Sequence, residues 1–245
     1  MARRDSNQSM QSYLFSCEHA TCAVPEAYRE LFRGAEDAVQ SGEGWEPGSL
    51  NLAQAFSMKF RTPLVHGDVT RLLIDLEKDG DERWSRFSMK LPELTRAKVA
   101  DRHERPFRAT LLQRITEDLR RHAVVLHVLV HTSEEIDGRI RLETPAESPM
   151  AQAVASAWRN QMRAADIDVL HFHDAERNAT EAFLAVEFAG QPYAQLRLTV
   201  AQSFFLEGRP WRWETVKKFL VESLPRAVDE ARALNDPGFP STAQV

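Results

Sequence analysis

Residues 13–20, YLFSCEHA, are a short apolar run that stops abruptly on Glu18 and His19, two side chains able to bind metal or move protons. Apolar runs of about four to eight residues are typical of buried strands in α/β proteins, and ligands collect just past the carboxyl ends of such strands. We therefore predict a strand here, followed by two residues of a functional site. A solvated turn after the strand is the structural alternative.

The composition is that of an ordinary globular protein, with 43% hydrophobic and 27% charged residues in a chain of 245. The formal net charge of −5, with acids and bases mixed along the chain, argues against nucleic acid or an anionic membrane as the main partner. No apolar run approaches the roughly 20 residues of a membrane helix, and the first residues lack the apolar region of a secretory signal. Two cysteines cannot build a disulfide scaffold. We expect a cytoplasmic protein whose oligomeric state the sequence does not indicate.

Strand and helix signals alternate along the rest of the chain. Apolar runs predict further strands at 64–66, 72–76, 124–131, 167–171, 183–188 and 193–200. Helical spacing predicts helices after Pro25, over 52–60, over 106–119, over 149–162 and from Trp213. Residues 77–105 are charged and irregular, which indicates a long loop or a small excursion over the site.

This alternation predicts a single α/β domain of three layers, with a mostly parallel central sheet and helices on both faces. We place the domain at residues 12–235. Residues 1–11 are polar and are expected to form a disordered leader, and residues 236–245 a loose tail.

The histidines differ in the positions that the strands would give them. His131 stands at the carboxyl end of the most apolar strand, where sites form, whereas His127 in the middle of that strand is expected to be a core residue. Their Cα atoms would lie about 13 Å apart, too far to share one ion easily. His171 and His173 form a His-x-His pair that is a rival metal site, with surface histidines as the ordinary alternative.

Three residues at separate strand ends form a candidate metal-binding set: His19, Asp75 and His131. Asp75 lies in the apolar run 72–76, and a buried carboxylate needs a partner or a metal, because burying it alone costs several kcal/mol. A set of nitrogen and oxygen donors with an open position for water suits zinc catalysis. The chain contains neither a phosphate-binding P-loop nor a G-x-S-x-G nucleophile elbow.

Several blocks of the sequence, in constant order over about residues 13 to 225, resemble the N-formylglutamate amidohydrolase family. FSCEHATCAVP (15–25) resembles its S-C-E-H-x-x-N-x-[IV]-P, and GWEPGSL (44–50) resembles G-[YW]-D-P-G-A-L. DVTRLLIDL (68–76) resembles D-V-S-R-L-[LV]-[VI]-D-L, and LVHT (129–132) resembles S-V-H-S. Shorter matches are RFS (86–88), RPFR (105–108) and VAQ (200–202).

The resemblance implies a zinc-dependent, exopeptidase-like α/β fold and removal of an N-acyl group from an amino acid. It supports a metal role for His19 and His131, with Asp75 as the third ligand and Glu18 as its competitor. Arg71, at the family's arginine position, would meet the substrate carboxylate, because the bidentate fork of arginine suits that role.

Two departures from the family pattern affect the expected chemistry. After the V-D-L block the family has N-R, where this chain has E-K at 77–78. The family's late G-I-E-L-E-V-N-Q contains acids suited to general-base work, and these positions are Arg197 and Thr199 here. Either another acid, such as Glu18 or Glu187, has taken over, or the substrate has changed, or hydrolysis is lost.

We therefore predict a zinc-dependent amidohydrolase that cleaves an N-acyl amino acid or a related small amide. Glu18 and Arg71 are the predicted catalytic residues, and Arg71, Lys78 and Arg197 the predicted substrate-binding residues. The alternative is a catalytically impaired descendant that binds a small acid or a partner.

Overall fold

The computed structural model of the protein describes residues 11–136, 138–206 and 210–235. Within them, a six-stranded sheet has the order β2-β1-β3-β6-β4-β5. Its strands are β1 (Gln11–Cys17), β2 (Leu64–His66), β3 (Val124–Ser133), β4 (Ile140–Glu143), β5 (Val169–Phe172) and β6 (Tyr193–Ala201). All neighbouring pairs are parallel except β4 with β6. The predicted mostly parallel sheet is therefore confirmed.

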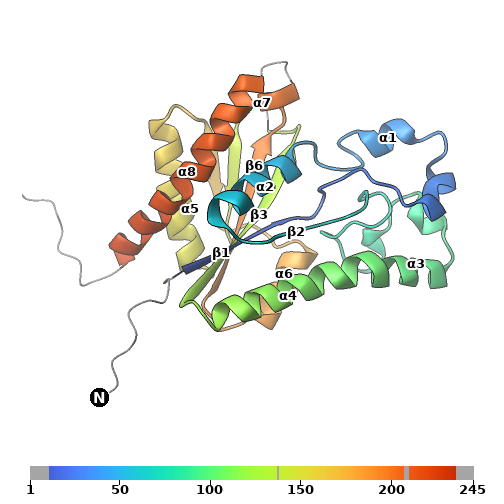
Figure 1. The fold of residues 1–245 in the computed structure, drawn as a ribbon, viewed down its shortest axis with the longest axis horizontal. Coiled ribbons are helices and arrows are strands. Elements are labelled where there is room, and N and C mark those ends of the chain that lie inside the picture. Colours follow the sequence, from blue (N-terminus) through green and yellow to red (C-terminus); the bar gives the residue numbers. More distant parts are fainter. Residues whose placement is uncertain (1–10, 137, 207–209, 236–245) are drawn as a thin grey trace, which may run out of the picture.

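Helices cover both faces of the sheet (Figure 1). The helices α2 (Ser49–Phe60), α5 (Pro149–Ala164) and α8 (Pro210–Asn235), with the short α7 (Ser203–Leu206), pack on one face around Trp158 and Phe56. The helices α4 (Arg105–Leu119) and α6 (Ala179–Glu187) pack on the other face through Leu111 and Leu184. The three layers agree with the predicted fold class.

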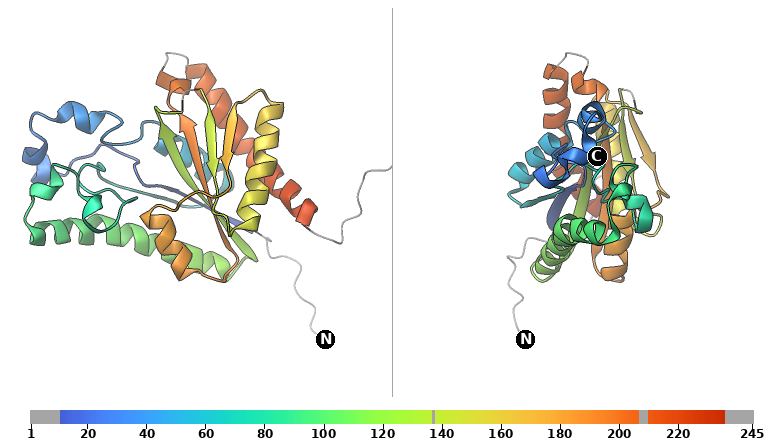
Figure 2. Two further views of the ribbon diagram at one scale, coloured as in Figure 1. Left: turned by 180° about the vertical axis from the view of Figure 1, so that it is seen from behind. Right: turned by 90° about the vertical axis from the view of Figure 1, so that its right-hand side faces the viewer.

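A separate lobe extends beyond the carboxyl ends of β1 and β2 (Figures 1 and 2). It contains η1 (Glu26–Phe32), α1 (Glu36–Gln40), η2 (Gly80–Arg83), η3 (Ser88–Lys90), α3 (Glu93–Val99) and the π-helical η4 (Ala100–Glu104). Its own small core gathers Phe32, Leu73 and Val99. The predicted excursion over 77–105 is thus part of a folded lobe next to the sheet edge where the site lies.

Two predicted strands are wrong. Residues 72–76 are buried but form no strand; they lie in turns of the lobe, where Asp75 N donates to Arg83 O instead of to a sheet partner. Residues 183–188 lie mostly in helix α6, which begins with a capping box between Asn178 and Glu181. Short apolar runs suit a buried strand and a buried helix equally well, and the capping residues decide here.

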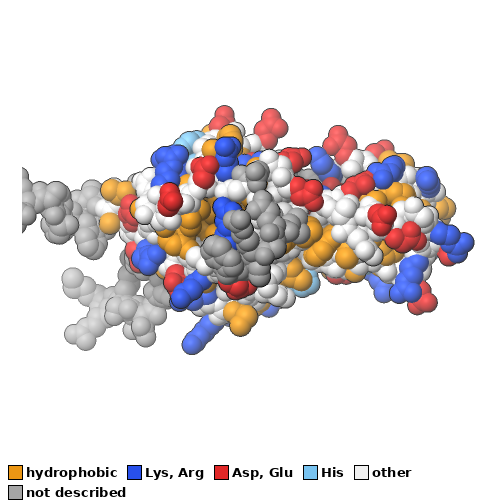
Figure 3. Space-filling view, turned by 90° about the horizontal axis from the view of Figure 1, so that it is seen from above, with side chains coloured by type: hydrophobic (Ala, Val, Ile, Leu, Met, Phe, Trp, Pro, Cys, Tyr) orange, Lys and Arg blue, Asp and Glu red, His pale blue; other side chains and the backbone are white. Residues whose placement is uncertain are grey.

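The surface agrees with the mixed charge of the sequence. In the view of Figure 3, acidic and basic side chains are interspersed over the visible face. No helix in the described ranges is long and apolar enough to cross a membrane. The predicted loose tail at 236–245 and residues 1–10 of the predicted leader lie outside the described residues, whereas Gln11 belongs to β1.

Candidate metal centre

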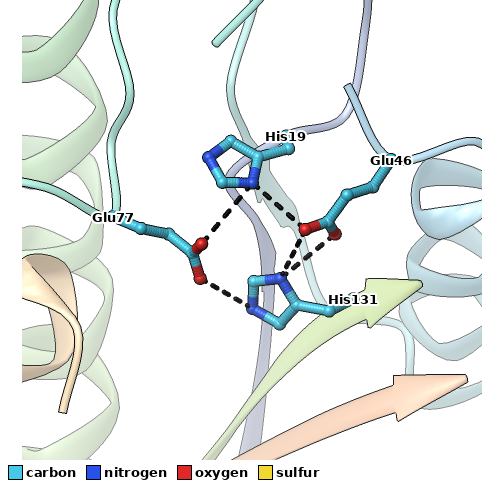
Figure 4. A group of neighbouring side chains, drawn as sticks. All are labelled: His19, Glu46, Glu77 and His131. Atoms are coloured by element: carbon cyan, nitrogen blue, oxygen red, sulfur yellow. Dashed lines mark hydrogen bonds and ion pairs between the residues drawn. The ribbon is translucent and has the colours of Figure 1, made fainter. Parts of the chain in front are cut away.

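Four side chains from four separate segments converge at the carboxyl edge of the sheet (Figure 4). His19 follows β1, His131 lies near the end of β3, Glu46 precedes α2, and Glu77 follows the turns at 70–76. Each offers one ligand atom, and these atoms all lie within 4.8 Å of one another. The sequence prediction that His19 and His131 meet is therefore confirmed by their positions.

The distances within this cluster fit a shared cation. His19 Nδ1 lies 3.1 Å from Glu46 Oε1, and His131 Nδ1 lies 3.1 Å from Glu46 Oε2. Glu77 closes the other side, with one oxygen 3.7 Å from His19 Nδ1 and the other 3.7 Å from His131 Nε2. One ion would take a single nitrogen from each ring, and with one ligand atom from each residue the four atoms lie within 4.8 Å of one another, close enough to gather around one cation.

Unsatisfied polar atoms also indicate a missing group. His131 Nε2 and both carboxylate oxygens of Glu18 are buried without a hydrogen-bond partner. Burying such atoms unpaired is costly, and a bound cation or water would remove part of that cost. The donor set, two imidazoles and two carboxylates, is one that zinc accepts. The residues present therefore fit a divalent metal ion.

Asp75 lies behind His19 rather than in the cluster. His19 donates a hydrogen bond of 2.9 Å from Nε2 to Asp75 Oδ1, and the backbone N–H of Glu77 donates to the same oxygen at 2.9 Å. A carboxylate in this position fixes the orientation of an imidazole and raises its basicity toward a metal. Glu46 and Glu77 supply the carboxylates of the cluster, and the role of Asp75 as third ligand stays a prediction.

Glu18 lies near His131, at the same ring nitrogen that Glu77 faces. Its Oε2 lies 3.6 Å from His131 Nε2, and its side chain is completely buried. Burial raises the pKa of Glu18 to about 7. The residue does not line the neighbouring cavity, and its catalytic role stays a prediction.

The electrostatics of the site favour cations. Burial lowers the pKa of His131, but the carboxylates of Glu46 and Glu77 outweigh burial and raise it to about 9. The pKa of His19 is likewise raised well above its usual value, against burial, by Glu77, Asp75 and Glu46. Burial raises the pKa of Glu46, yet the two imidazoles lower it overall. The carboxylates thus hold positive charge here, as protons or as a metal ion.

Two close backbone contacts build this edge. The N–H of Gly67, just after β2, donates to Cys17 O at 2.9 Å, and a Cβ added at Gly67 would lie 2.0 Å from Glu18 O. Only glycine lets β2 approach the Glu18–His19 turn so closely. The N–H of Glu46 donates to His19 O at 3.0 Å, which ties the loop before α2 to the same turn.

A cavity of about 440 Å³ opens beside the cluster, lined among others by Glu77, His131, Arg71 and Arg197. Arg71 donates to the carbonyl oxygens of residues 42 and 43, and its Nη1 lies 3.4 Å from His19 Nδ1. Arg197 pairs with Glu181 and Glu143.

The other predicted site residues lie elsewhere. Lys78 lines a neighbouring groove and not this cavity. The rings of His171, on β5, and His173, just after it, have centroids 3.8 Å apart and are tilted by 43°. Among the described residues, the cluster around His131 is the only group of three or more such side chains whose ligand atoms converge.

Sequence reasoning missed Glu46 and Glu77 as members of the cluster. Glu46 stands at the acid of the G-[YW]-D-P-G block, so the block itself contained the signal. Glu77 was visible only as a departure from a neutral residue. Neither lies on a strand, and periodicity therefore gives no indication of either.

The fold and the cluster define an α/β protein with a candidate metal centre at the carboxyl edge of its sheet. No family model and no curated protein matches the chain. Among solved structures, a gene product from Agrobacterium tumefaciens is similar, with 20% identity and a TM-score of 0.71 over 90% of this chain and 91% of that one. N-formylglutamate amidohydrolase from Ralstonia eutropha is also similar, with 14% identity and a TM-score of 0.66 over 89% of this chain and 93% of that one. The chain therefore has the N-formylglutamate amidohydrolase fold, as the sequence resemblance implied.

Proposed function

We propose that the protein is a metal-dependent hydrolase that cleaves the amide of an N-acyl amino acid or a related small amide, with Zn²⁺ as the ion. The observation that carries the proposal is the convergence of His19, Glu46, Glu77 and His131 beside a cavity. The similarity in fold to an N-formylglutamate amidohydrolase supports the reaction class. When bound by these residues, a divalent ion polarises an amide carbonyl and acidifies a water molecule.

Arg71 is proposed to orient the substrate. Its guanidinium borders the cavity and is held by two backbone carbonyl oxygens, so its remaining donor edge is fixed next to the cluster. A fixed guanidinium suits a substrate carboxylate. Arg197, the other predicted substrate-binding arginine in this cavity, is already paired with two glutamates, which suits a role in shaping the wall.

Glu77 is proposed to exchange the proton during hydrolysis, which leaves His19, Glu46 and His131 as the ligands and the fourth position of the ion open to water. The positions of the family's late acids are Arg197 and Thr199, so neither can act as a base. Glu77 lines the cavity and faces both histidines, whereas Glu18 is buried and does not line the cavity. A positioned carboxylate commonly contributes about 10²- to 10⁴-fold to such a reaction.

Metal analysis and a substrate panel test the proposal together. The purified protein should bind one Zn²⁺ per chain and hydrolyse at least one member of a panel of N-acyl amino acids. His19→Ala and His131→Ala should abolish zinc binding and hydrolysis. His171→Ala and His173→Ala, the matched controls at the rival pair, should retain zinc binding and hydrolysis. Metal binding without any turnover would favour the alternative of a protein that binds a small acid.

A further inference from the structure

Helix α6 presents an apolar face to solvent. Ala182 is exposed, Val186 is 75% exposed and Phe183 is half-buried, while Leu184 on the opposite face is in the core. The helix contains two acids, of which Glu181 is buried and pairs with Arg197. A surface helix usually has charged or polar residues on its outer face, so this composition marks a binding surface.

This face forms the floor of a groove of about 790 Å³, here called the α6 groove. Ala179, Ala182, Phe183 and Val186 line it from α6, and Arg108 lines it from α4. The guanidinium of Arg108 lies 5.2 Å from the centre of the Phe183 ring. The groove is therefore an apolar strip bordered by polar side chains.

The α6 groove adjoins the cavity beside the candidate metal centre. Glu77 and Arg197 line both the α6 groove and the cavity beside the cluster. Asn178, at the start of α6, donates a hydrogen bond of 2.9 Å to Glu77 Oε1 and also lines the groove. A substrate whose amide lies at Glu77 would therefore extend along α6 on one side and toward Arg71 on the other.

The charges of the groove select a neutral occupant. Its lining contains four bases, Lys78, Arg108, Arg177 and Arg197, and four acids, Glu77, Asp79, Glu82 and Glu176. This balance provides no net attraction for an acidic or a basic chain. Methylene groups that cover the apolar strip at its floor would instead bind favourably, because they remove apolar surface from water.

We propose that the α6 groove binds the acyl chain of the substrate, and that the preferred substrate is an N-acyl amino acid with a medium-length aliphatic acyl group. This inference rests on the proposed hydrolase function. The strip from Ala179 to Val186 spans about 10 Å of helix, enough for a chain of about eight carbons. The amino acid part would lie on the Arg71 side of the cluster.

Zinc-loaded protein assayed with N-acetyl, N-hexanoyl and N-octanoyl derivatives of one amino acid tests this inference. In the wild type, kcat/KM should rise about two- to fourfold per added methylene up to about eight carbons. Ala182→Glu adds a charge to an exposed position of the strip and should remove this rise while leaving the N-acetyl substrate unchanged. Met58→Glu, on the exposed surface of α2, is the matched control and should retain the rise.

A binding measurement separates this inference from the proposed function. Calorimetry with N-octanoyl and N-acetyl amino acids should show tighter binding of the longer chain to the wild type and to Met58→Glu, but not to Ala182→Glu, even if nothing is hydrolysed. A flat or falling chain-length series in both assays overturns the groove assignment. So does a change in particle mass of Ala182→Glu in light scattering, because the strip would then be a contact between copies of the chain.

Discussion

Asn178 donates a hydrogen bond of 2.9 Å from Nδ2 to Glu77 Oε1, and its own Oδ1 accepts one of 2.8 Å from the N–H of Glu181. One side chain thus caps helix α6 and holds the carboxylate that faces His19 and His131. The backbone N–H of Ala179 also donates to Glu77 O. The start of α6 is therefore a structural part of the candidate metal centre.

The two carboxylates of the cluster should differ in their effect on metal affinity. Glu46 contacts both imidazoles at about 3 Å, so Glu46→Gln should abolish stoichiometric zinc binding. Glu77→Asn, which restores the neutral residue of the family pattern, should weaken zinc binding by about tenfold or more and lower kcat further. Competition with a zinc chelator measures both affinities. Glu134→Gln, in the cavity wall but outside the cluster, is the control, and an equal loss there would contradict the assignment.

Asp75 should act on the metal through His19. Asp75→Asn preserves the shape of the side chain but removes the charge behind His19 Nε2, and such outer partners typically contribute about 10- to 100-fold in metal affinity. The same chelator competition measures this loss. Asp79→Asn changes an exposed side chain that pairs with Arg83 and accepts from the N–H of Gly80, and this variant should bind zinc like the wild type.

The metal-free protein should lose stability as the pH rises. The pKa of His131 is about 9 in the folded state and near 6.5 when unfolded, so the folded protein holds a proton that the unfolded chain releases. This stabilisation is complete below about pH 6.5 and is lost as the pH rises through about 9, by up to about 1.4 kcal/mol per pH unit. Urea denaturation of chelator-treated protein between pH 6 and 10 measures it. Zinc-loaded protein should not show this fall in unfolding free energy with pH. An equal fall in the metal-free and zinc-loaded forms would refute its assignment to the proton on His131.

Gly67 should tolerate no side chain. A methyl group there would overlap Glu18 O at 2.0 Å, and forcing this turn apart should cost about 1–3 kcal/mol of unfolding free energy. Gly42→Ala is the matched control, because its added Cβ would meet only the flexible end of Glu134 at 3.0 Å. Denaturant midpoints compare the two variants. A Gly67→Ala protein as stable as Gly42→Ala would show that the turn can move.

Arg71 should affect substrate binding more than turnover. Arg71→Lys replaces a planar fork by a single point charge, so KM for a short N-acyl amino acid should rise by about tenfold or more with a smaller change in kcat. Lys78→Met is informative beside it, because Lys78 lines the α6 groove and not the cavity at the cluster. It should leave KM for the N-acetyl substrate unchanged. A larger rise in KM for Lys78→Met than for Arg71→Lys would assign substrate binding to Lys78 instead of Arg71.

Local sequence patterns predicted those parts of the fold in which burial follows a simple period. The continuous apolar run of β3 predicted a strand covered on both faces, and β3 indeed lies between β1 and β6. The same criterion failed for residues 72–76, because burial there comes from the small core of the lobe and not from a sheet. For α6, the capping residues Asn178 and Glu181 were a better guide than the apolar run that follows them.

The candidate site was predictable where its residues terminate strands. His19 and His131 were found in this way because parallel strands end at one edge of the sheet. Glu46 and Glu77 lie on irregular segments whose positions depend on contacts with residues far along the chain, such as the bond from Glu46 N to His19 O. No local period contains that information, whereas the apolar run 72–76 draws attention to Asp75.

The burial of the cluster has a kinetic consequence. His131 is the last of the four donors to be synthesised, and its strand must pair with β1 before its ring can meet Glu46. The four donors can therefore converge only after residue 131 has been made and β3 lies beside β1. The proposed ion should exchange slowly with a chelator in solution, because His19, Glu46 and His131 are buried.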